Sequence, residues 1–316
     1  MSFIRRIPIP MSALALGVAG LGNLLLPYSP VVRAACGVVA ASIVLLVLAR
    51  IVFDFAGVRA ELGKPGVLAV FPTLFMATML LAAYLKPYAP TFATGMWVVA
   101  LTLQLIVAVV CAVRFFRSFA LSQVLPAWFL VFVGFVVGSV TSPAFGALLV
   151  GRMLLYVGLA GYLGILPVVI YRMVKVGGLP EPALPTMAIF AAPPSLCLAG
   201  YLAVTSAKQP VVVYALLAMA AASLVYVFTH LPRILKSPFH PSYSALTFPF
   251  VISGIALKQA NLFLAKTPAG SFIPNAAVLA MDVFVTLMVF YVLVRYALFV
   301  ALPAEKPAAA AAPAGA

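Results

Sequence analysis

Acidic residues are scarce in this sequence, because its 316 residues include only five Asp and Glu side chains and two His. Asp54, Glu61, Glu181 and Glu305 fall in polar breaks, and Asp282 alone lies within an apolar run. No carboxylate pair and no His cluster can be assembled for general acid–base or metal-dependent catalysis. The sequence therefore predicts that the protein is not an enzyme and uses no cofactor or metal.

The cysteines give no indication of a metal site or a disulfide. The three cysteines, Cys36, Cys111 and Cys197, lie singly in three different apolar runs. Paired spacing is what marks a metal site or a disulfide framework, and it is missing. We expect these thiols to be small buried apolar side chains.

Apolar residues, by contrast, dominate the chain. It is 66% hydrophobic and only 8% charged, with a mean hydropathy of +1.23, which leaves too little polar surface for a soluble globule of this length. A bilayer crossing needs about 20 apolar helical residues. The sequence thus predicts an all-α polytopic membrane protein with ten transmembrane helices, at 11–27, 34–53, 66–85, 92–113, 123–141, 150–171, 185–204, 211–230, 243–264 and 276–300.

The net charge of +14 is explained by topology. With ten spans, 13 of the 19 Lys and Arg residues fall on the side of the N-terminus and 6 on the other side. The positive-inside rule then predicts that both termini are cytoplasmic, in a multi-pass protein of the inner (plasma) membrane, with the lipid bilayer rather than nucleic acid as its partner. The expected organisation is a cytoplasmic segment at 1–10, a transmembrane domain at 11–301 and a disordered Ala/Pro-rich tail at 302–316.

Proline recurs in alternate spans. Pro10, Pro72, Pro126, Pro193 and Pro249 lie in or at the start of the odd-numbered runs, 54 to 67 residues apart, and the even runs contain almost no proline. An interior proline costs a helix about 3 kcal/mol, which a membrane helix tolerates where neighbours or water satisfy the freed carbonyl. Broken helices at matching places in a repeated unit indicate a solute path.

Small and hydroxyl residues gather in the same odd spans. Gly17, Gly20, Asn23, Thr73 and Ser253 are examples, whereas the even spans are rich in Leu, Val and Ala on all sides. We therefore expect five helical hairpins around one central pore, with the odd helices inside and the even helices facing lipid. The alternative is that the glycines, as in the GFVVG run, only permit close helix packing.

Asp282 is the one acid within a predicted span, and Lys258 in the preceding span is its candidate partner. Both lie about six residues from the outer ends of their spans, so their side chains can be level. An ionised Asp in a membrane costs at least about 2.5 kcal/mol unless it is paired. The favoured interpretation is a structural ion pair. Proton coupling through Asp282, or attraction of anions by Lys258, is the alternative.

Four pieces of the chain resemble the tellurite-resistance/dicarboxylate transporter family, which includes TehA-like bacterial proteins and the slow-type anion channels of plant guard cells. The pieces are IPIPMSALALGVAGLGNLL, AELGKPGVLAVFPTLFMATMLLAAYL, FAAPPSLCLAGYLAV and SYSALTFPFVISGIALKQA. They occur in the family's order, and the similarity extends from about Pro8 to Ala301.

The resemblance implies a homotrimer in which each protomer has its own pore, with inner helices kinked at Pro72, Pro126, Pro193 and Pro249. It also implies that Phe248 of the TFP run occludes the pore. Phe250 lies about 200° further round a helix and is expected to face elsewhere. Without the family, Phe248 would be an ordinary core aromatic.

Four functions remain open at this point. The first is an anion channel or facilitator that conducts small anions, such as chloride or nitrate, or C4-dicarboxylates. The second is a proton-coupled transporter of a specific oxyanion or organic acid, such as tellurite, sulfite or malate, with Asp282 as the coupling acid. A structural or regulatory membrane protein with a closed pore is third, and a membrane enzyme is last because its residues are lacking.

Overall fold

The computed structural model describes residues 3–117 and 119–302, and within this part of the chain every regular element is a helix. Five long helices correspond to the even-numbered spans predicted from the sequence. They are α2 (Pro30–Phe53), α6 (Pro90–Arg117), α9 (Leu148–Lys175), α11 (Pro210–Lys236) and α13 (Asn275–Ala301). We call them the outer helices. Proline starts three of them, at a position where its missing N–H has no intrahelical partner to lose.

Five shorter or broken segments alternate with the outer helices, and we call them the inner segments. They are α1 (Met11–Leu25), α4 (Pro65–Val70) with α5 (Thr73–Leu85), α7 (Trp128–Phe132) with α8 (Val136–Thr141), η4 (Glu181–Ala191) with α10 (Ala192–Val204), and η5 (Pro241–Leu246) with α12 (Phe248–Leu264). Minor helix η1 (Ile4–Arg6) precedes α1, and α3 (Phe55–Leu62), η2 (Leu121–Gln123) and η3 (Ser142–Phe145) lie between inner segments and outer helices.

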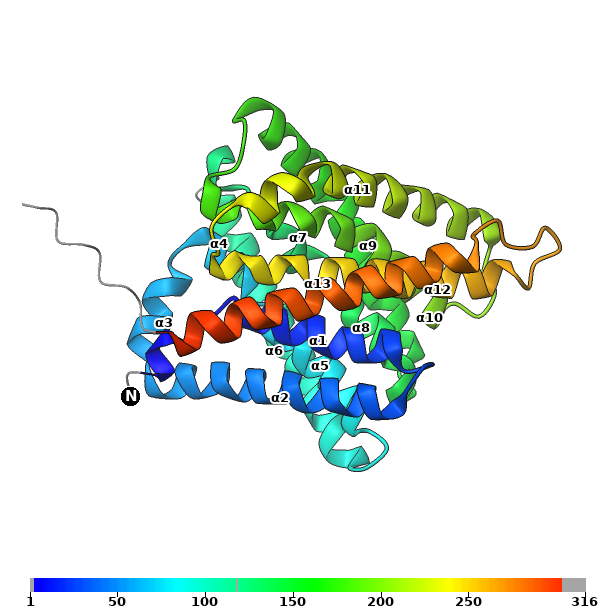
Figure 1. Cartoon of the computed structure of the whole chain (residues 1–316), viewed down its shortest axis with the longest axis horizontal. Coiled ribbons are helices and arrows are strands. Elements are labelled where there is room, and N and C mark those ends of the chain that lie inside the picture. Colours follow the sequence, from blue (N-terminus) through cyan, green and yellow to red (C-terminus); the bar gives the residue numbers. More distant parts are fainter. Residues whose placement is uncertain (1–2, 118, 303–316) are drawn as a thin grey trace, which may run out of the picture.

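The inner segments form a closed ring. In chain order, α1 packs on α5, α5 on α8, α8 on α10, α10 on α12, and α12 returns to α1. Each outer helix packs against the inner helix that precedes it, so the fold consists of five antiparallel pairs. α1, α2, α12 and α13 run lengthwise across the molecule (Figure 1). All inner segments begin at the end that holds the N-terminus, which we call the N-terminal end; the opposite end is the far end.

Burial separates the two sets as the sequence pattern predicted. In three inner segments, 67% to 83% of the residues in the most apolar 18-residue stretch are buried, whereas in the outer helices 22% to 39% are buried. Eight helical segments of the described chain are long and apolar enough to cross a membrane. Met11–Leu25 and Val136–Phe145, in the first and fifth predicted spans, are shorter apolar helices, so the count of ten spans stays a prediction.

We expected the five prolines to kink the interiors of helices, but they lie at helix starts. Pro10 and Pro72 precede the first residues of α1 and α5, Pro126 lies in the turn before α7, and Pro193 and Pro249 occupy the first turns of α10 and α12. At the start of a helix a proline removes no intrahelical hydrogen bond, so the expected cost of about 3 kcal/mol does not arise. The inner segments are broken beside these prolines, because a new helix begins there.

Other boundaries were wrong in detail. The outer helices α6, α9 and α11 continue past the predicted ends, to Arg117, Lys175 and Lys236. Helix α3 was not predicted. The residues before the first span are packed into the fold, because Ile7 and Ile9 are fully buried and the Ile7 carbonyl accepts a hydrogen bond from Arg50. The predicted tail from residue 303 lies outside the described residues.

Candidate functional site

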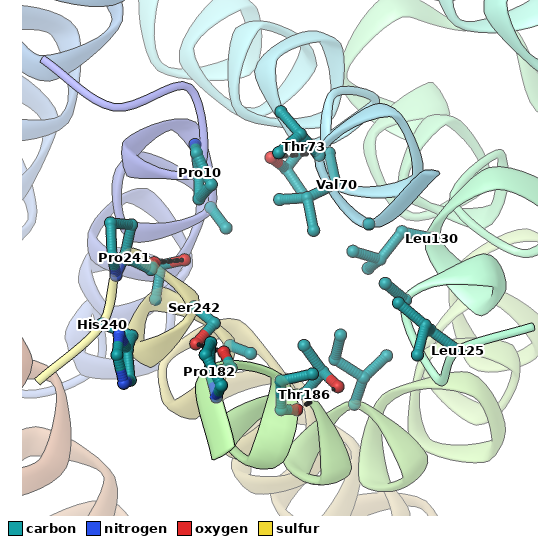
Figure 2. A pocket seen from close by; sticks show the side chains of 18 of the residues that line it. Pro10, Val70, Thr73, Leu125, Leu130, Pro182, Thr186, His240, Pro241 and Ser242 are labelled. Atoms are coloured by element: carbon teal, nitrogen blue, oxygen red, sulfur yellow. Dashed lines mark hydrogen bonds between the residues drawn. The ribbon is translucent and has the colours of Figure 1, made fainter. Parts of the chain in front are cut away.

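A cavity of about 520 Å³ opens inside the ring at the N-terminal end, and we call it the first cavity. The starts of all five inner segments line it, through residues such as Pro10, Val70, Leu130, Thr186 and Ser244. Figure 2 shows Pro10, Val70, Leu130 and Thr186 around one open space, with Leu125 opposite Pro10 and His240. Of the five prolines at the starts of the inner helices, Pro10 and Pro249 line this cavity.

Hydroxyl groups in the first cavity are already engaged as donors. Thr73 donates to the Val70 carbonyl at 2.8 Å, Thr186 to the Ala183 carbonyl at 2.6 Å and Ser244 to the Pro241 carbonyl at 3.1 Å. A hydroxyl has a single proton, so these groups have little donor capacity left for a solute. The wall is otherwise mostly Pro, Val, Leu and Ala, and a solute that enters it finds few strong polar contacts.

Two charged residues, Glu61 and Lys64, line the first cavity. Glu61 is paired with the guanidinium of Arg50, a side chain that is only 5% exposed. Lys64 has no carboxylate within 4.0 Å among the described residues. The charge at this mouth is therefore positive on balance, although it includes one acid that the sequence analysis did not place there.

A second cavity, of about 290 Å³, lies in the half of the ring toward the far end. Its lining includes Asn23, Thr141 and Gln259, together with apolar residues of α5, α8 and α12, and it includes no charged residue. None of the described residues of the five outer helices lines either cavity. The weakly polar axis is thus built from the inner segments, as their composition predicted.

Phe248 stands between the two cavities. Among the described residues, it is the one side chain that lines both, and it is 3% exposed. A gap of about 10 Å³ between them is walled by Phe248 with Met76, Phe129, Leu130, Leu196 and their neighbours. A space of that size holds about one water molecule. In this conformation the axis is closed to any hydrated ion by an apolar ring.

Phe250 lies elsewhere. Its side chain is fully buried, stacks against Phe228 with ring centroids 5.9 Å apart, and meets Phe284 edge-on at 5.1 Å. It lines none of the cavities described above. Two neighbouring phenylalanines of one helix therefore have different surroundings, since two residues correspond to about 200° of helix rotation.

Asn23 is the polar residue with the best-defined orientation. The Arg33 Nε donates to Asn23 Oδ1 at 3.0 Å, and the Arg33 guanidinium lies 4.0 Å from the ring centre of Tyr84. Arginine can only donate, so the amide oxygen must face Arg33 and the amide NH₂ is left for other partners. Since Asn23 lines the second cavity, its NH₂ is a candidate donor to a solute there.

Lys258 and Asp282 are in contact, with Lys258 Nζ 2.6 Å from Asp282 Oδ2. Tyr28 donates its hydroxyl to the same oxygen at 2.8 Å, and Lys258 also donates to the Leu24 carbonyl at 3.1 Å. The cluster joins the end of α1, α12 and α13 near the far end. Neither charged residue lines the cavities along the axis.

The glycines of the inner segments fit both interpretations. Gly20 lines the second cavity and Gly134 lines the gap, yet a Cβ at Gly20 would lie 2.8 Å from Val251 Cγ1 and one at Gly134 would lie 2.3 Å from the Leu130 carbonyl oxygen. Gly17 and Gly138 also permit close packing, because a Cβ at Gly17 would lie 2.3 Å from Thr247 Oγ1 and one at Gly138 would lie 2.8 Å from Leu154 Cδ1. Several buried hydroxyls also join helices, as in the 3.0 Å contact of Ser195 with Ser253.

Sequence reasoning missed Lys64, His240 and Gln259 as lining residues. Lys64 and His240 lie directly before the starts of α4 and η5, and Gln259 lies one position after Lys258. All three lie in or next to a sequence piece that carries the family resemblance. The resemblance was therefore the signal that could have found them. Their side-chain directions depend on where each helix begins.

A polytopic helical protein with weakly polar cavities along one axis belongs to the class of membrane channels and transporters. The family of voltage-dependent anion channels (SLAC1) matches this chain over residues 6–297. The chain belongs to this family and is a multi-pass membrane protein that serves anion transport. A search of curated proteins finds no match to it.

Proposed function

We propose that the first cavity, the gap and the second cavity form one conduction path for small anions, and that Phe248 is its gate. The supporting observation is that Phe248 alone, among the described residues, lines the cavities on both sides of the closed gap. A benzyl group at this place fills the passage and interrupts any continuous file of water. An anion would have to shed its hydration shell within an apolar ring.

The charges along the path support anions over cations. Lys64 is the uncompensated charge at the first mouth, and the Asn23 amide is an oriented donor in the second cavity. The few hydroxyls keep their protons on backbone carbonyls. Weak contacts of this kind discriminate by ease of dehydration, so chloride and nitrate should pass more readily than strongly hydrated ions, with C4-dicarboxylates as the alternative cargo.

We place the protein in the inner (plasma) membrane with the N-terminal end in the cytoplasm.

Phe248→Ala tests the gate. The expected result is an increase in anion conductance of at least about tenfold in planar bilayers, since each 1.4 kcal/mol removed from a permeation barrier raises the rate tenfold. The hole should persist because the five inner segments are held apart by their own packing. The current should reverse near the chloride equilibrium potential.

Phe250→Ala is the matched control on the same helix. It deletes a fully buried ring that does not line the path, so it should destabilise the protein by about 3 to 5 kcal/mol and produce no gain of current. The gate has been assigned to the wrong aromatic if Phe248→Ala is as silent as the parent while a well-folded Phe250→Ala conducts.

Proton-coupled transport is the competing function. It would require Asp282 to exchange protons with the path, yet Asp282 is 2% exposed, bound to Lys258 and Tyr28, and lines none of the three axial cavities. Flux measured from reconstituted protein with chloride, nitrate, sulfite, malate and tellurite, with and without a pH gradient, separates the two. A flux that needs the gradient and is lost in Asp282→Asn would favour the coupled transporter.

A further inference from the structure

A separate cavity of about 590 Å³ lies beside the first cavity at the N-terminal end, and we call it the basic cavity. Four arginines line it, Arg5, Arg6, Arg50 and Arg295, together with one acid, Glu61. They come from the N-terminal segment, α2, α3 and α13. The red end of α13 lies next to the N-terminal segment in Figure 1.

Two of these arginines have no carboxylate partner in the part of the chain that the structure describes. Glu61 is bound by Arg50, and Asp54 lies 3.8 Å from Arg5 and 3.7 Å from Arg50, so the two acids offset two guanidinium groups. Within the described residues, no carboxylate lies within 4.0 Å of Arg6 or Arg295. The basic cavity therefore carries about two uncompensated positive charges in one place.

Arg295 is held in position by aromatic side chains. Its guanidinium lies 5.5 Å from the ring centre of Phe239, 5.7 Å from Tyr243 and 5.7 Å from Tyr291, and it donates one hydrogen bond to the Tyr291 hydroxyl at 3.2 Å. A guanidinium has five N–H donors. Most of them remain available on a group whose orientation is already restricted, which is the arrangement that binds a phosphate well.

Arg50 provides a second, independent observation. Arg50 is 4% exposed and lines the basic cavity. Its Nη1 and Nη2 donate to the Ile7 carbonyl and to Glu61, whereas its buried Nε, which lies 3.7 Å from Asp54 Oδ2, makes no hydrogen bond. A buried donor of a charged group is costly to leave unsatisfied. An anionic oxygen in the cavity would supply acceptor capacity close to this group.

The remaining wall of the basic cavity is apolar and continues along the surface. Leu298, Phe299 and Leu302 line it and are 51%, 42% and 60% exposed. From Leu298 an exposed apolar stripe extends toward the far end on one face of α13, through Val294, Phe290, Leu287 and Val283. Spacings of three and four residues place these side chains on one face of the helix.

We propose that the basic cavity binds the phosphate headgroup of an anionic phospholipid, with an acyl chain lying along the apolar stripe of α13. A free phosphate would use the arginines but not the stripe, whereas a phospholipid uses both. Basic pockets between helices at the cytoplasmic surface have the chemistry that binds anionic headgroups. The bound lipid would lie against the mouth of the conduction path, because Pro8 and Glu61 line both the basic cavity and the first cavity.

The test is lipid binding by the full-length protein, purified in mild detergent and measured by native mass spectrometry. Phosphatidylglycerol and phosphatidylcholine with identical acyl chains are added in turn, and inorganic phosphate is added as a competitor. We expect retained adducts with phosphatidylglycerol and few with phosphatidylcholine. Arg6→Gln combined with Arg295→Gln should weaken phosphatidylglycerol binding by at least about tenfold, since each basic residue near the surface contributes appreciably to anionic-lipid binding.

Arg233→Gln is the matched control, because Arg233 is an exposed residue in the last turns of α11 at the same end and does not line the basic cavity. Phosphatidylglycerol binding should be unchanged in it. The proposal is overturned if Arg233→Gln weakens binding as much as the double variant, if the two lipids bind equally, or if inorganic phosphate displaces the lipid completely. Thermal melting of each variant verifies that it is folded. Leu298→Gln keeps all four arginines of the basic cavity, so it should weaken the binding of phosphatidylglycerol but not that of inorganic phosphate.

Discussion

Lys258 and Asp282 illustrate how one pair of charges is accommodated inside an apolar protein. Lys258 Nζ lies 2.6 Å from Asp282 Oδ2, the Tyr28 hydroxyl donates to that oxygen, and Lys258 lies 4.5 Å from the Tyr28 ring centre. The pair is almost fully removed from solvent, with side-chain exposures of 16% and 3%. Each charge is tolerated because the other is present, so a structural role is favoured over attraction of anions.

Removing one partner of this pair should be worse than removing both. Lys258→Gln or Asp282→Asn alone leaves one buried charge without its partner and should cost about 3 to 5 kcal/mol of stability. Lys258→Gln combined with Asp282→Asn should melt at a higher temperature in detergent than either single variant.

Arg5→Gln is the control for this cycle, because the Arg5 and Asp54 pair spans 3.8 Å and Arg5 is 66% exposed. Exposed pairs contribute about 0 to 1 kcal/mol, so this change should leave the melting temperature almost unaltered. Single Lys258 or Asp282 variants as stable as the parent would contradict a structural pair.

At the scale of elements, two inner segments change from a 3-10 helix to an α-helix beside a proline. η4 meets α10 at Ala191 and Ala192, and η5 is followed after Thr247 by α12. The Thr247 hydroxyl lies 2.7 Å from the Ser244 carbonyl oxygen and 3.2 Å from the Ala13 carbonyl oxygen of α1, and its one proton is shared between them, so this junction is tied to its neighbour. Phe248 is the first residue of α12, and its position is set where the new helix begins.

Gly17→Ala should disturb that junction. A Cβ at Gly17 would lie 2.3 Å from Thr247 Oγ1 and 2.4 Å from its Cβ, so α1 and the start of α12 must separate. Overpacking of this kind costs about 1 to 3 kcal/mol, which thermal melting in detergent should detect.

Gly164→Ala is the comparison variant, because a Cβ there meets nothing within 4 Å. Alanine is the better helix former, so this substitution in α9 should be neutral or stabilising by up to about 1 kcal/mol. Equal stability of Gly17→Ala and Gly164→Ala would argue against the close approach of α1 to Thr247.

At the scale of the whole molecule, the outer helices present large apolar faces. Val31, Leu45, Val52, Leu149 and Val211 are 60% to 75% exposed. Lipid covers such surfaces in a membrane, and protomer contacts can cover part of them. The family resemblance favours a trimer in which each chain keeps its own path, since the ring of inner segments is closed within one chain.

The trimer is a prediction with a direct test. Native mass spectrometry in mild detergent should give a mass about three times the 33.2 kDa of one chain. Phe248→Ala should not change this mass, because Phe248 is 3% exposed and lies on the axis of a single chain. A monomeric mass for the parent under these conditions would end the claim.

Much of the architecture could be predicted from the sequence. Scarce charge and long apolar runs require a bilayer, and the alternation of proline-bearing with Leu- and Val-rich runs predicts which segments lie inside. These properties are local in the chain and depend on composition and period alone. The resemblance of the TFP run directed the prediction to Phe248 rather than Phe250, and the gating role of Phe248 stays a prediction.

Only the tertiary structure decided how the axis is built. The first cavity is lined by residues from Pro8 to Pro249 and the second by residues from Gly20 to Gln259. The positions of Lys64, His240 and Asn23 therefore depend on where each helix starts and which face it turns inward. The basic cavity likewise combines Arg6 with Arg295, from opposite ends of the chain. Such groupings follow from packing between helices, because a one-residue shift in a helix start rotates every side chain that follows by about 100°.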